Sequence, residues 1–380
     1  MTPRERLLAA LERREPAGVP VDLGGTGTST ITRQAYMNLR SSLGLPEVTP
    51  EFISFTAQSV RPHSDILDAL RIDTRGVNPR GSSTFKPLIH TEGAYEHFSD
   101  ESGVVYRRPV DGGFYFDMYQ HPLTGKDASE IEAYRFPWGG DPARAAGLRE
   151  ECQAIRNAGF PVILSQSLGR GILHEGTALF GFEDYFTRFY LEEALIDSVT
   201  ERILQNKIEF YTVMLGEIGD LVDVVTEADD LGTQRGPFIS PDSYRKRIKP
   251  YHRRLFAEIR RLAPEVKIFF HSCGSIAEFI PDLIDIGADA LNPLQLSADG
   301  MDPVLLKREY GRDICFWGGG VDTQHVLPRG SIDEVKDETR RRLDQWLPGG
   351  GYVFAAVHNI QDDVPPEHIT AVFEVLDEYR

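Results

Sequence analysis

The chain has 380 residues, 41% of them hydrophobic, and shows no compositional bias toward a fibrous or disordered protein. Its 58 acidic residues outnumber 41 basic ones, and the formal charge of −17 argues against nucleic-acid partners and anionic membrane surfaces. No apolar run reaches membrane-spanning length, the N-terminal segment has no apolar signal core, and three cysteines cannot form a disulfide framework. We therefore expect a soluble, cytoplasmic protein with reduced thiols.

Short β-rich runs alternate with helical patterns along the chain, as in parallel strands joined by crossover helices. Eight runs are predicted as strands, at residues 19–24, 72–79, 161–167, 220–229, 266–273, 288–295, 313–320 and 351–359. Eight parallel strands close most naturally into a barrel, so the predicted fold is an α/β, (β/α)8 TIM barrel. Barrels of this kind run this long as one domain, so we expect a single domain over residues 1–380.

Helix-start signals fall between the predicted strands. Ser240 precedes a proline and a helical pattern, while Ser275 and Ser331 each stand three residues before a glutamate, which is the spacing of a capping box. The exception to the alternation is the stretch 80–137, which is too long for an ordinary connection and contains strand-like runs around "DGG". We interpret it as a β-rich insertion after the second strand, on the face of the barrel that carries the chemistry.

Polar residues gather at the predicted C-terminal ends of the strands, and in a barrel these ends meet at one mouth. They are Glu227, Asp229 and Asp230 from the fourth strand, His271 and Cys273 from the fifth, Asn292 and Gln295 from the sixth, Asp322 and Gln324 from the seventh, and His358, Asn359 and Gln361 from the eighth. We expect catalytic roles for Glu227, Asp229, Asn292, Gln295 and Asp322. We expect substrate contacts from Arg33, Arg80, Gln324 and Asn359.

A metal site is the sharpest of these expectations. His271 and Cys273 are two residues apart on a strand, so their side chains point to the same side, and an imidazole with a thiolate suits Zn²⁺. We expect His358 as the third ligand and Glu227 as an oxygen ligand or a hydrogen-bond partner of a ligand. The alternatives are that the histidine and cysteine only pack in the core, and that His358 hydrogen-bonds a substrate or a carboxylate.

The motifs "HSCG", "FWGGGVDTQ", "PGGGYVFAAVHNIQ" and "DVPPEHITAVFEVLDEY" resemble the uroporphyrinogen decarboxylase-like superfamily, which includes the zinc-dependent corrinoid methyltransferases. The resemblance spans nearly the whole chain and implies an eight-stranded barrel. The methyltransferases share the His-x-Cys pair, here His271 and Cys273, but take a cysteine from the last strand as third ligand. This chain has "GYVFAAVHN" there, without cysteine, so His358 is the expected replacement.

The porphyrinogen decarboxylases of the superfamily carry an arginine-rich N-terminal motif for the substrate's carboxylates and an aspartate after the second strand. The matching regions here, "GGTGTSTITRQAY" and "VNPRGSSTF", contain Arg33 and Arg80, but the second segment has no acid. A histidine at the end of the last strand is common in that branch and matches His358. This resemblance supports a site at the strand ends and leaves the reaction open.

Three functions follow as hypotheses. The first is a zinc-dependent methyltransferase that moves a methyl group between a small molecule, such as a thiol, methyl ether or methylamine, and a corrinoid protein. The corrinoid (cobalamin) is expected on a separate partner, because the sequence has no Asp-x-His-x-x-Gly motif. The second is a metal-independent carboxy-lyase, and the third a non-catalytic ligand-binding barrel. The methyl donor, the direction of transfer and homo-oligomer formation are left open.

Overall fold

The computed structural model describes residues 1–113 and 115–380. Among these residues, seven parallel strands form one curled sheet in the order β14, β13, β12, β11, β10, β9, β4. The strands are β4 (Arg75–Val77), β9 (Val162–Leu164), β10 (Val224–Ala228), β11 (Lys267–His271), β12 (Ala290–Asn292), β13 (Cys315–Trp317) and β14 (Tyr352–Val353). Each strand lies inside a range predicted from the sequence, and the fold is of the α/β class with a parallel sheet.

The first predicted strand, residues 19–24, connects the two edges of this sheet. Val21 forms a parallel bridge with Phe354, just after β14, and the Asp22 N–H donates to the Phe354 carbonyl at 2.8 Å. On the other side, the Asp73 N–H donates to the Val21 carbonyl at 3.0 Å, ahead of β4. The segment therefore lies where a closed barrel needs its first strand.

The strands alternate between two apolar clusters, because successive side chains point to opposite faces of a sheet. Phe269 and Trp317 belong to the inner cluster, while Ile268 and Phe270 belong to the outer cluster that contacts the helices. Helix α1 (Pro3–Leu11) contributes Leu7, Ala10 and Leu11 to the inner cluster. Because the Arg4 N–H donates to Gly159 O, ahead of β9, this helix covers the N-terminal end of the sheet and leaves the C-terminal end for function.

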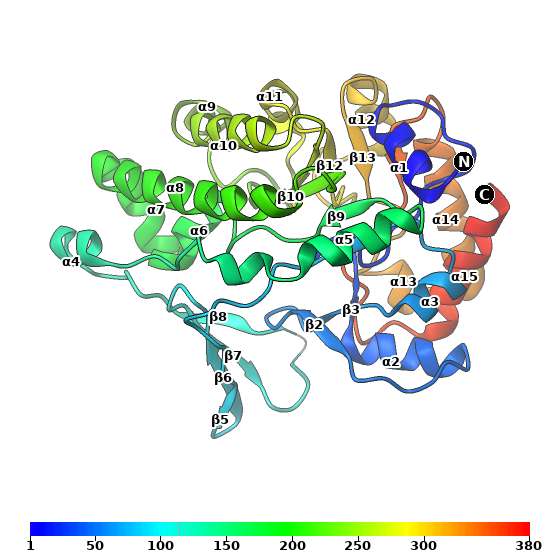
Figure 1. The fold of residues 1–380 in the computed structure, drawn as a ribbon, viewed down its shortest axis with the longest axis horizontal. Helices are drawn as coiled ribbons and strands as arrows, with labels where there is room; N and C mark the ends of the chain where they lie inside the picture. Colours follow the sequence, from blue (N-terminus) through cyan, green and yellow to red (C-terminus); the bar gives the residue numbers. More distant parts are fainter. Residues whose placement is uncertain (114) are drawn as a thin grey trace.

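The larger helices surround the sheet, with α8 and α10 side by side along one flank and α14 and α15 on another (Figure 1). The described helices beyond α1 are α2 (Arg33–Ser42), α3 (Ser64–Ala69), α4 (Ala128–Ala133), α5 (Leu148–Asn157), α6 (Ile172–Phe180), α7 (Phe182–Leu191), α8 (Glu193–Ile218), α9 (Pro241–Arg247), α10 (Lys249–Leu262), α11 (Ile280–Ile286), α12 (Pro303–Tyr310), α13 (Val326–Arg329), α14 (Ile332–Trp346) and α15 (Pro366–Leu376). None of the helices in the described part of the chain combines the length and the apolar composition that a membrane crossing requires.

Two of the three predicted helix starts are confirmed. Ser240 caps α9, and Ser331 forms a full capping box with Glu334 at the start of α14. The capping box predicted at Ser275 is wrong: the backbone N–H of Ser275 donates to Thr233 O at 2.7 Å, and a short 3₁₀ turn (Ala277–Phe279) precedes α11. The chain is still crossing the mouth of the sheet at that point, so the helix begins later than the pattern indicates.

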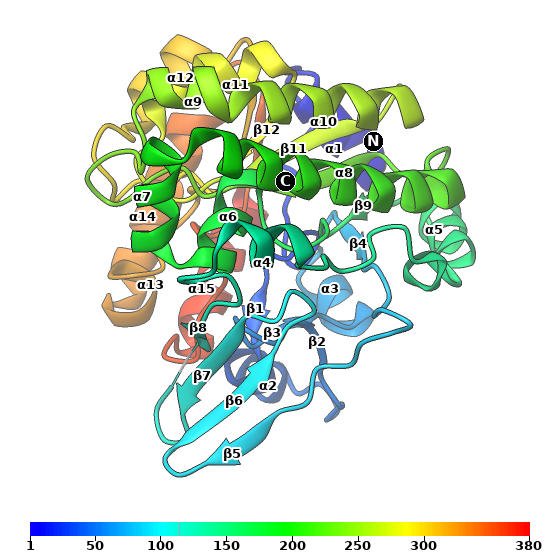
Figure 2. The same ribbon diagram turned by 90° about the vertical axis from the view of Figure 1, so that its left-hand side faces the viewer.

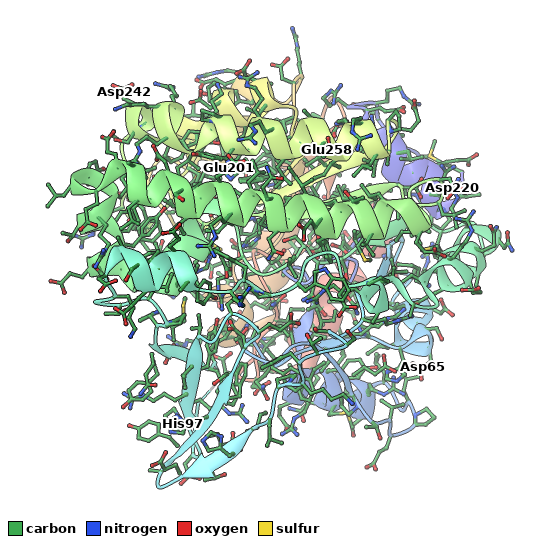
Figure 3. All side chains as sticks on the ribbon, turned by 60° about the vertical axis from the view of Figure 1, so that its left-hand side comes forward. Asp65, His97, Glu201, Asp220, Asp242 and Glu258 are labelled. Atoms are coloured by element: carbon green, nitrogen blue, oxygen red, sulfur yellow. The ribbon has the colours of Figure 1, made fainter. Side chains whose placement is uncertain are left out.

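Between β4 and β9 the chain forms a four-stranded antiparallel sheet that projects from the body of the molecule (Figure 2). Its strands are β5 (His90–Glu92), β6 (Tyr95–Ser99), β7 (Val105–Pro109) and β8 (Asp117–Gln120). One face packs Phe98, Tyr106 and Phe116 against Ala178 of α6, whereas His97 points to the opposite side (Figure 3). Phe114, in the strand-like run predicted at 112–119, lies outside the described residues.

A second small sheet, which the sequence did not suggest, lies between the first predicted strand and β4. It consists of β1 (Ile31–Thr32), β2 (Glu51–Ser54) and β3 (Ser59–Arg61) in the order β1, β3, β2. The turn from β2 toward β3 contains Ser54 and Thr56, which reach the C-terminal end of the large sheet.

Candidate metal centre

His271, Cys273 and His358 converge at the C-terminal end of the large sheet. His271 is the last residue of β11, Cys273 follows two residues later, and His358 lies in the segment after β14. Each offers one ligand atom, and these three atoms lie within 4.8 Å of one another. The Cys273 Sγ and the His271 Nε2 are 3.4 Å apart, and the two imidazole ring centroids are 5.6 Å apart.

Asn292, the last residue of β12, orients the ring of His271. The Nδ2 of Asn292 donates to Trp317 O at 2.9 Å and its Oδ1 accepts from Thr28 Oγ1 at 3.1 Å, which fixes the direction of the amide. The His271 Nδ1–H then donates to the same Oδ1 at 2.6 Å. The lone pair is therefore on Nε2, the nitrogen that points toward Cys273.

The backbone after Cys273 is held in one conformation by local geometry. Gly274 has a φ of +85°, and a Cβ at this position would lie 2.5 Å from the backbone of Gly232. The Gly274 N–H donates to Gln295 Oε1 at 2.8 Å, and the Cys273 N–H donates to Asp230 Oδ1 at 2.9 Å. A glycine is required there, and Gln295 supports the loop that carries the thiol.

Burial and neighbouring charge set the protonation of the cluster. Burial raises the pKa of the Cys273 thiol well above its ordinary value, and the nearby Asp230 carboxylate acts in the same direction. Burial, with His271 beside it, lowers the pKa of His358 to about 4. His358 is thus a neutral imidazole near neutral pH, and a bound cation would displace the proton of the thiol.

Asp230 and His174 lie at the edge of the cluster. Asp230 Oδ1 is 3.7 Å from His271 Nε2, and Asp230 Oδ2 is 3.6 Å from His174 Nδ1. Burial would raise the pKa of Asp230, but the neighbouring imidazoles of His174 and His271 and the hydrogen bond from the Cys273 N–H together outweigh it, and the pKa is lowered. Asp230 is therefore an ionised carboxylate that adds negative charge beside the three ligand atoms.

A cavity of about 480 Å³ opens over this cluster, within the size range of small-molecule sites. His271, His358 and Asp230 line it on one side, and Ser54 and Thr56 line it from the small sheet. Two of the three metal-ligand candidates, His271 and His358, are thus in contact with a space large enough for a substrate.

Two of the predicted catalytic acids have strong protein partners. Glu227 lines the cavity, but its carboxylate accepts from Lys207 Nζ at 3.1 Å and from Tyr211 Oη at 2.8 Å. Asp229 is fully buried and is not among the cavity-lining residues. It accepts from the N–H groups of Leu173 and His174, at 2.8 Å each, and so holds the first turn of α6.

The other predicted residues are divided between the cavity and the outer surface. Asn359 lines the cavity, and its Oδ1 accepts from Thr30 N at 2.8 Å. Asp322 accepts from the Gln324 N–H at 2.7 Å in a turn, and neither of these two residues lines the cavity. Gln324 is exposed, as expected for a residue on the rim.

The structure does not bring the two predicted arginines to the cavity. Arg33 is exposed as the first residue of α2. Arg80 donates to Glu151 Oε2 at 2.7 Å and to a backbone carbonyl, on the outer side of the sheet's β4 edge. Substrate contacts through these residues require a ligand outside the described cavity.

Lys207 and His174 had no predicted role, and the sequence indicates Arg170 only as one of several scattered arginines available to a polycarboxylate. Lys207 lies in the middle of the 26-residue helix α8, where a lysine carries no signal of burial. His174 and Arg170 belong to the glycine-rich stretch after the third predicted strand, whose sequence resembles an ordinary pocket wall. Only the position of that stretch after a strand, at the functional end of the sheet, pointed to it.

Comparison with known proteins agrees with the fold. A sequence profile of the family "Uroporphyrinogen decarboxylase (URO-D)" matches residues 171–379. The uroporphyrinogen decarboxylase of Acidiphilium cryptum is 27% identical over 188 residues, which cover 49% of this chain and 48% of that protein. The enzyme of the same name from Methylococcus capsulatus is 28% identical over 112 residues, covering 30% of this chain and 29% of its own length. The matches thus span about half or less of these curated relatives.

Among solved structures, a methyltransferase from Methanosarcina mazei superposes with a TM-score of 0.66 at 18% sequence identity, covering 100% of this chain and 99% of that chain. At this identity the likeness establishes a shared fold over the whole chain. The family profile covers more than half of the chain and includes every element that carries the metal-ligand candidates. The chain therefore belongs to the uroporphyrinogen decarboxylase (URO-D) family.

Proposed function

We propose that this protein is a zinc-dependent methyltransferase that moves a methyl group between a small molecule and a separate corrinoid protein. The observation that carries the proposal is the convergence of His271, Cys273 and His358, whose ligand atoms lie within 4.8 Å of one another, with His271 and His358 lining a cavity. A half-buried cysteine and two histidines, brought together from the ends of β11 and β14, form a donor set that suits a metal ion.

The donor set fits zinc. One thiolate and two imidazoles are preferred zinc ligands, and three protein ligands leave a fourth position for a substrate atom, as catalytic zinc sites require. When bound, zinc would supply a Lewis acid that favours the deprotonated form of a thiol or polarises the oxygen or nitrogen that carries a methyl group. His358 takes the place that the resemblance assigned to a cysteine.

The chain's own residues would prepare this site. Asn292 keeps the Nε2 of His271 unprotonated, and Asp230 holds the backbone of Cys273. The cavity would position a substrate against His271 and His358, which line it. The absence of a cobalamin motif from the sequence is the reason to place the corrinoid on that partner.

A carboxy-lyase is the second candidate, because both curated relatives described above are uroporphyrinogen decarboxylases. Recognition of a polycarboxylate needs free cations at the cavity. Arg33 and Arg80, the arginines of the matching sequence regions, do not line it. The metal-ligand cluster also has no role in a metal-independent decarboxylation, so we place this candidate second.

Metal content tests the proposal directly. After reconstitution with zinc and dialysis against a weak chelator, the wild type should retain about one zinc per chain by elemental analysis. Cys273→Ala and His358→Ala should each lose more than about 100-fold in zinc affinity. Removing a residue that only hydrogen-bonds a metal ligand costs roughly 10–100-fold, and removing a ligand itself should cost more. Cys152→Ala, in α5, and His97→Ala, on the projecting sheet, are matched controls that should keep the metal.

Zinc-loaded protein should then transfer a methyl group from a methylated substrate to a reduced corrinoid protein, monitored by the absorbance change of the corrinoid. The absence of zinc from the wild type, or its retention in both ligand variants, would contradict the proposal. If the protein binds zinc but transfers no methyl group from or to a panel of thiols, methyl ethers and methylamines, the methyltransferase proposal is rejected. A carboxy-lyase or a non-catalytic ligand-binding barrel would then be the better hypothesis.

A further inference from the structure

The side chains around the cavity are mostly neutral hydrogen-bonding groups. Hydroxyl and amide side chains line it from five separate segments: Thr28, Ser54, Thr56, Ser165, Gln166, Ser167, Thr226 and Asn359. Phe269 is the sole Phe, Tyr or Trp among the described residues that line it, and it is 1% exposed. A flat aromatic ligand could stack only on the imidazole rings of His174, His271 and His358, and it would face polar groups that it cannot satisfy.

The arginine of the cavity is already paired with carboxylates. Arg170 is the one Arg or Lys among the described lining residues, and its guanidinium donates to Asp100 at 2.5 Å and to Glu175 at 3.1 Å. Two acids against one arginine leave this wall negative, and Glu227 is neutralised by the buried Lys207. An anionic ligand would therefore have to break existing ion pairs and approach further carboxylates.

Gln166 and Ser167 offer a complementary acceptor and donor. The Nε2 of Gln166 donates to Ile53 O at 3.0 Å, which orients the amide and leaves its Oε1 as an acceptor for a ligand. The Oγ of Ser167 accepts from the ammonium of Lys207 at 3.3 Å, which leaves the hydroxyl proton of Ser167 free to donate. An acceptor and a donor in the same cavity match a ligand with several hydroxyls, because a hydroxyl both donates and accepts.

We propose that the cavity binds a neutral, hydroxyl-rich methylated compound, of the class of O-methyl or S-methyl polyols, and that Gln166 and Ser167 recognise its hydroxyls. The methyl group of this substrate class rests on the proposed methyl transfer. The recognition of the polyol rests only on the hydroxyl and amide groups of the lining, the paired Arg170 and the orientation of Gln166. A volume of about 480 Å³ accommodates a ligand of monosaccharide size.

Isothermal titration of the zinc-loaded protein with three probes tests the assignment. Methyl α-D-glucopyranoside represents the neutral polyol methyl ethers, 2-methoxyphenol the aromatic methyl ethers, and succinate the carboxylates. The glucoside should bind at least about tenfold more tightly than either other probe. Gln166→Leu should weaken its binding by about tenfold or more, and Ser167→Ala should weaken it in the same direction. Gln153→Leu, an exposed glutamine of α5, should leave binding unchanged.

Circular dichroism and thermal unfolding identify any variant that fails to fold, and with two independent variants at the site the test does not depend on one of them. Three results would each overturn the inference. They are tighter binding of succinate or 2-methoxyphenol than of the glucoside, no glucoside binding at millimolar concentration, and a glucoside affinity in Gln166→Leu and Ser167→Ala that equals that of the wild type. The same titration of Cys273→Ala separates the two proposals. If Cys273→Ala still binds the glucoside and the wild type transfers no methyl group, the ligand class is supported and the methyltransferase function is rejected.

Discussion

Asn292 is the residue that determines which nitrogen of His271 can bind a metal. Its Oδ1 accepts the Nδ1–H at 2.6 Å, so removal of the amide frees the ring to change tautomer and to rotate. Asn292→Ala should therefore lower zinc affinity by about 10–100-fold, measured by competition with a chromophoric chelator. It should leave the stoichiometry at saturating zinc unchanged, because the three ligands are still present.

Asn157→Ala, at the exposed end of α5, is the matched control and should bind zinc as the wild type does. Equal affinity of Asn292→Ala and the wild type would show that the position of His271 does not depend on this hydrogen bond. A loss as large as that of Cys273→Ala would instead identify Asn292 as a direct ligand, in place of one of the three histidine and cysteine side chains.

The metal-ligand candidates were predictable because strand geometry is local: residues two apart share a side, and parallel strand ends meet. The partners of these ligands were not. Lys207 contacts Glu227 from a helix face that only the packing of α8 on the sheet determines. Asp229 differs from Asp230 by one position, yet it bonds α6 and does not line the cavity. A shift of one residue reverses the side, and the sequence does not mark where a strand ends to that accuracy.

At the scale of elements, the ion pair between Arg40 and Asp65 connects α2 to the start of α3. The Arg40 side chain is 1% exposed, and its guanidinium donates to both carboxylate oxygens of Asp65, at 2.8 and 2.7 Å. This hydrogen bonding lowers the pKa of Asp65 to about 2, from 3.8. Because the folded-state pKa is the lower one, the pair stabilises the fold above about pH 4, and this contribution is lost as the pH falls toward 2.

Asp65→Asn should therefore lower the free energy of unfolding by about 1–2 kcal/mol at pH 7, as expected for a charged hydrogen bond that is partly exposed to solvent. The difference from the wild type should shrink between pH 4 and pH 3 in urea titrations. Asp242→Asn is the control, because this carboxylate is 95% exposed at the start of α9 (Figure 3). A difference that stays constant with pH would contradict the pairing.

Element prediction succeeded for strands that alternate with helical patterns and failed where tertiary contacts decide. The buried strands β10 and β11 have five residues each, contain the apolar pairs or triplets "VV" and "IFF", and lie in their predicted ranges. The strands β1, β2 and β3 have two to four residues each, stand outside the alternation of strands and helices, and form because they pair with one another. The first strand of the barrel is similarly short, and its bridge to Phe354 depends on closure of the whole sheet.

At the scale of the molecule, the proposed metal and the fold should be separable. The metal-ligand candidates stand at strand ends, and protein groups hold them there: Asn292 for His271, and Asp230 and Gln295 for the loop of Cys273. The core below them is apolar and is covered by helices on all sides. Such a site stabilises the fold by mass action and does not provide its core, unlike the structural zinc of a small domain.

Removal of zinc with a strong chelator should therefore leave the far-ultraviolet circular dichroism at 25 °C unchanged and lower the melting temperature by about 5–10 °C. This corresponds to roughly 4 kcal/mol of binding free energy at a thousandfold excess of metal over its dissociation constant. Added zinc should restore the melting temperature, and Cys273→Ala should not respond to the chelator. Loss of helical signal on chelation would mean that the metal holds the barrel together. The site would then be structural, which contradicts the open coordination position that methyl transfer needs.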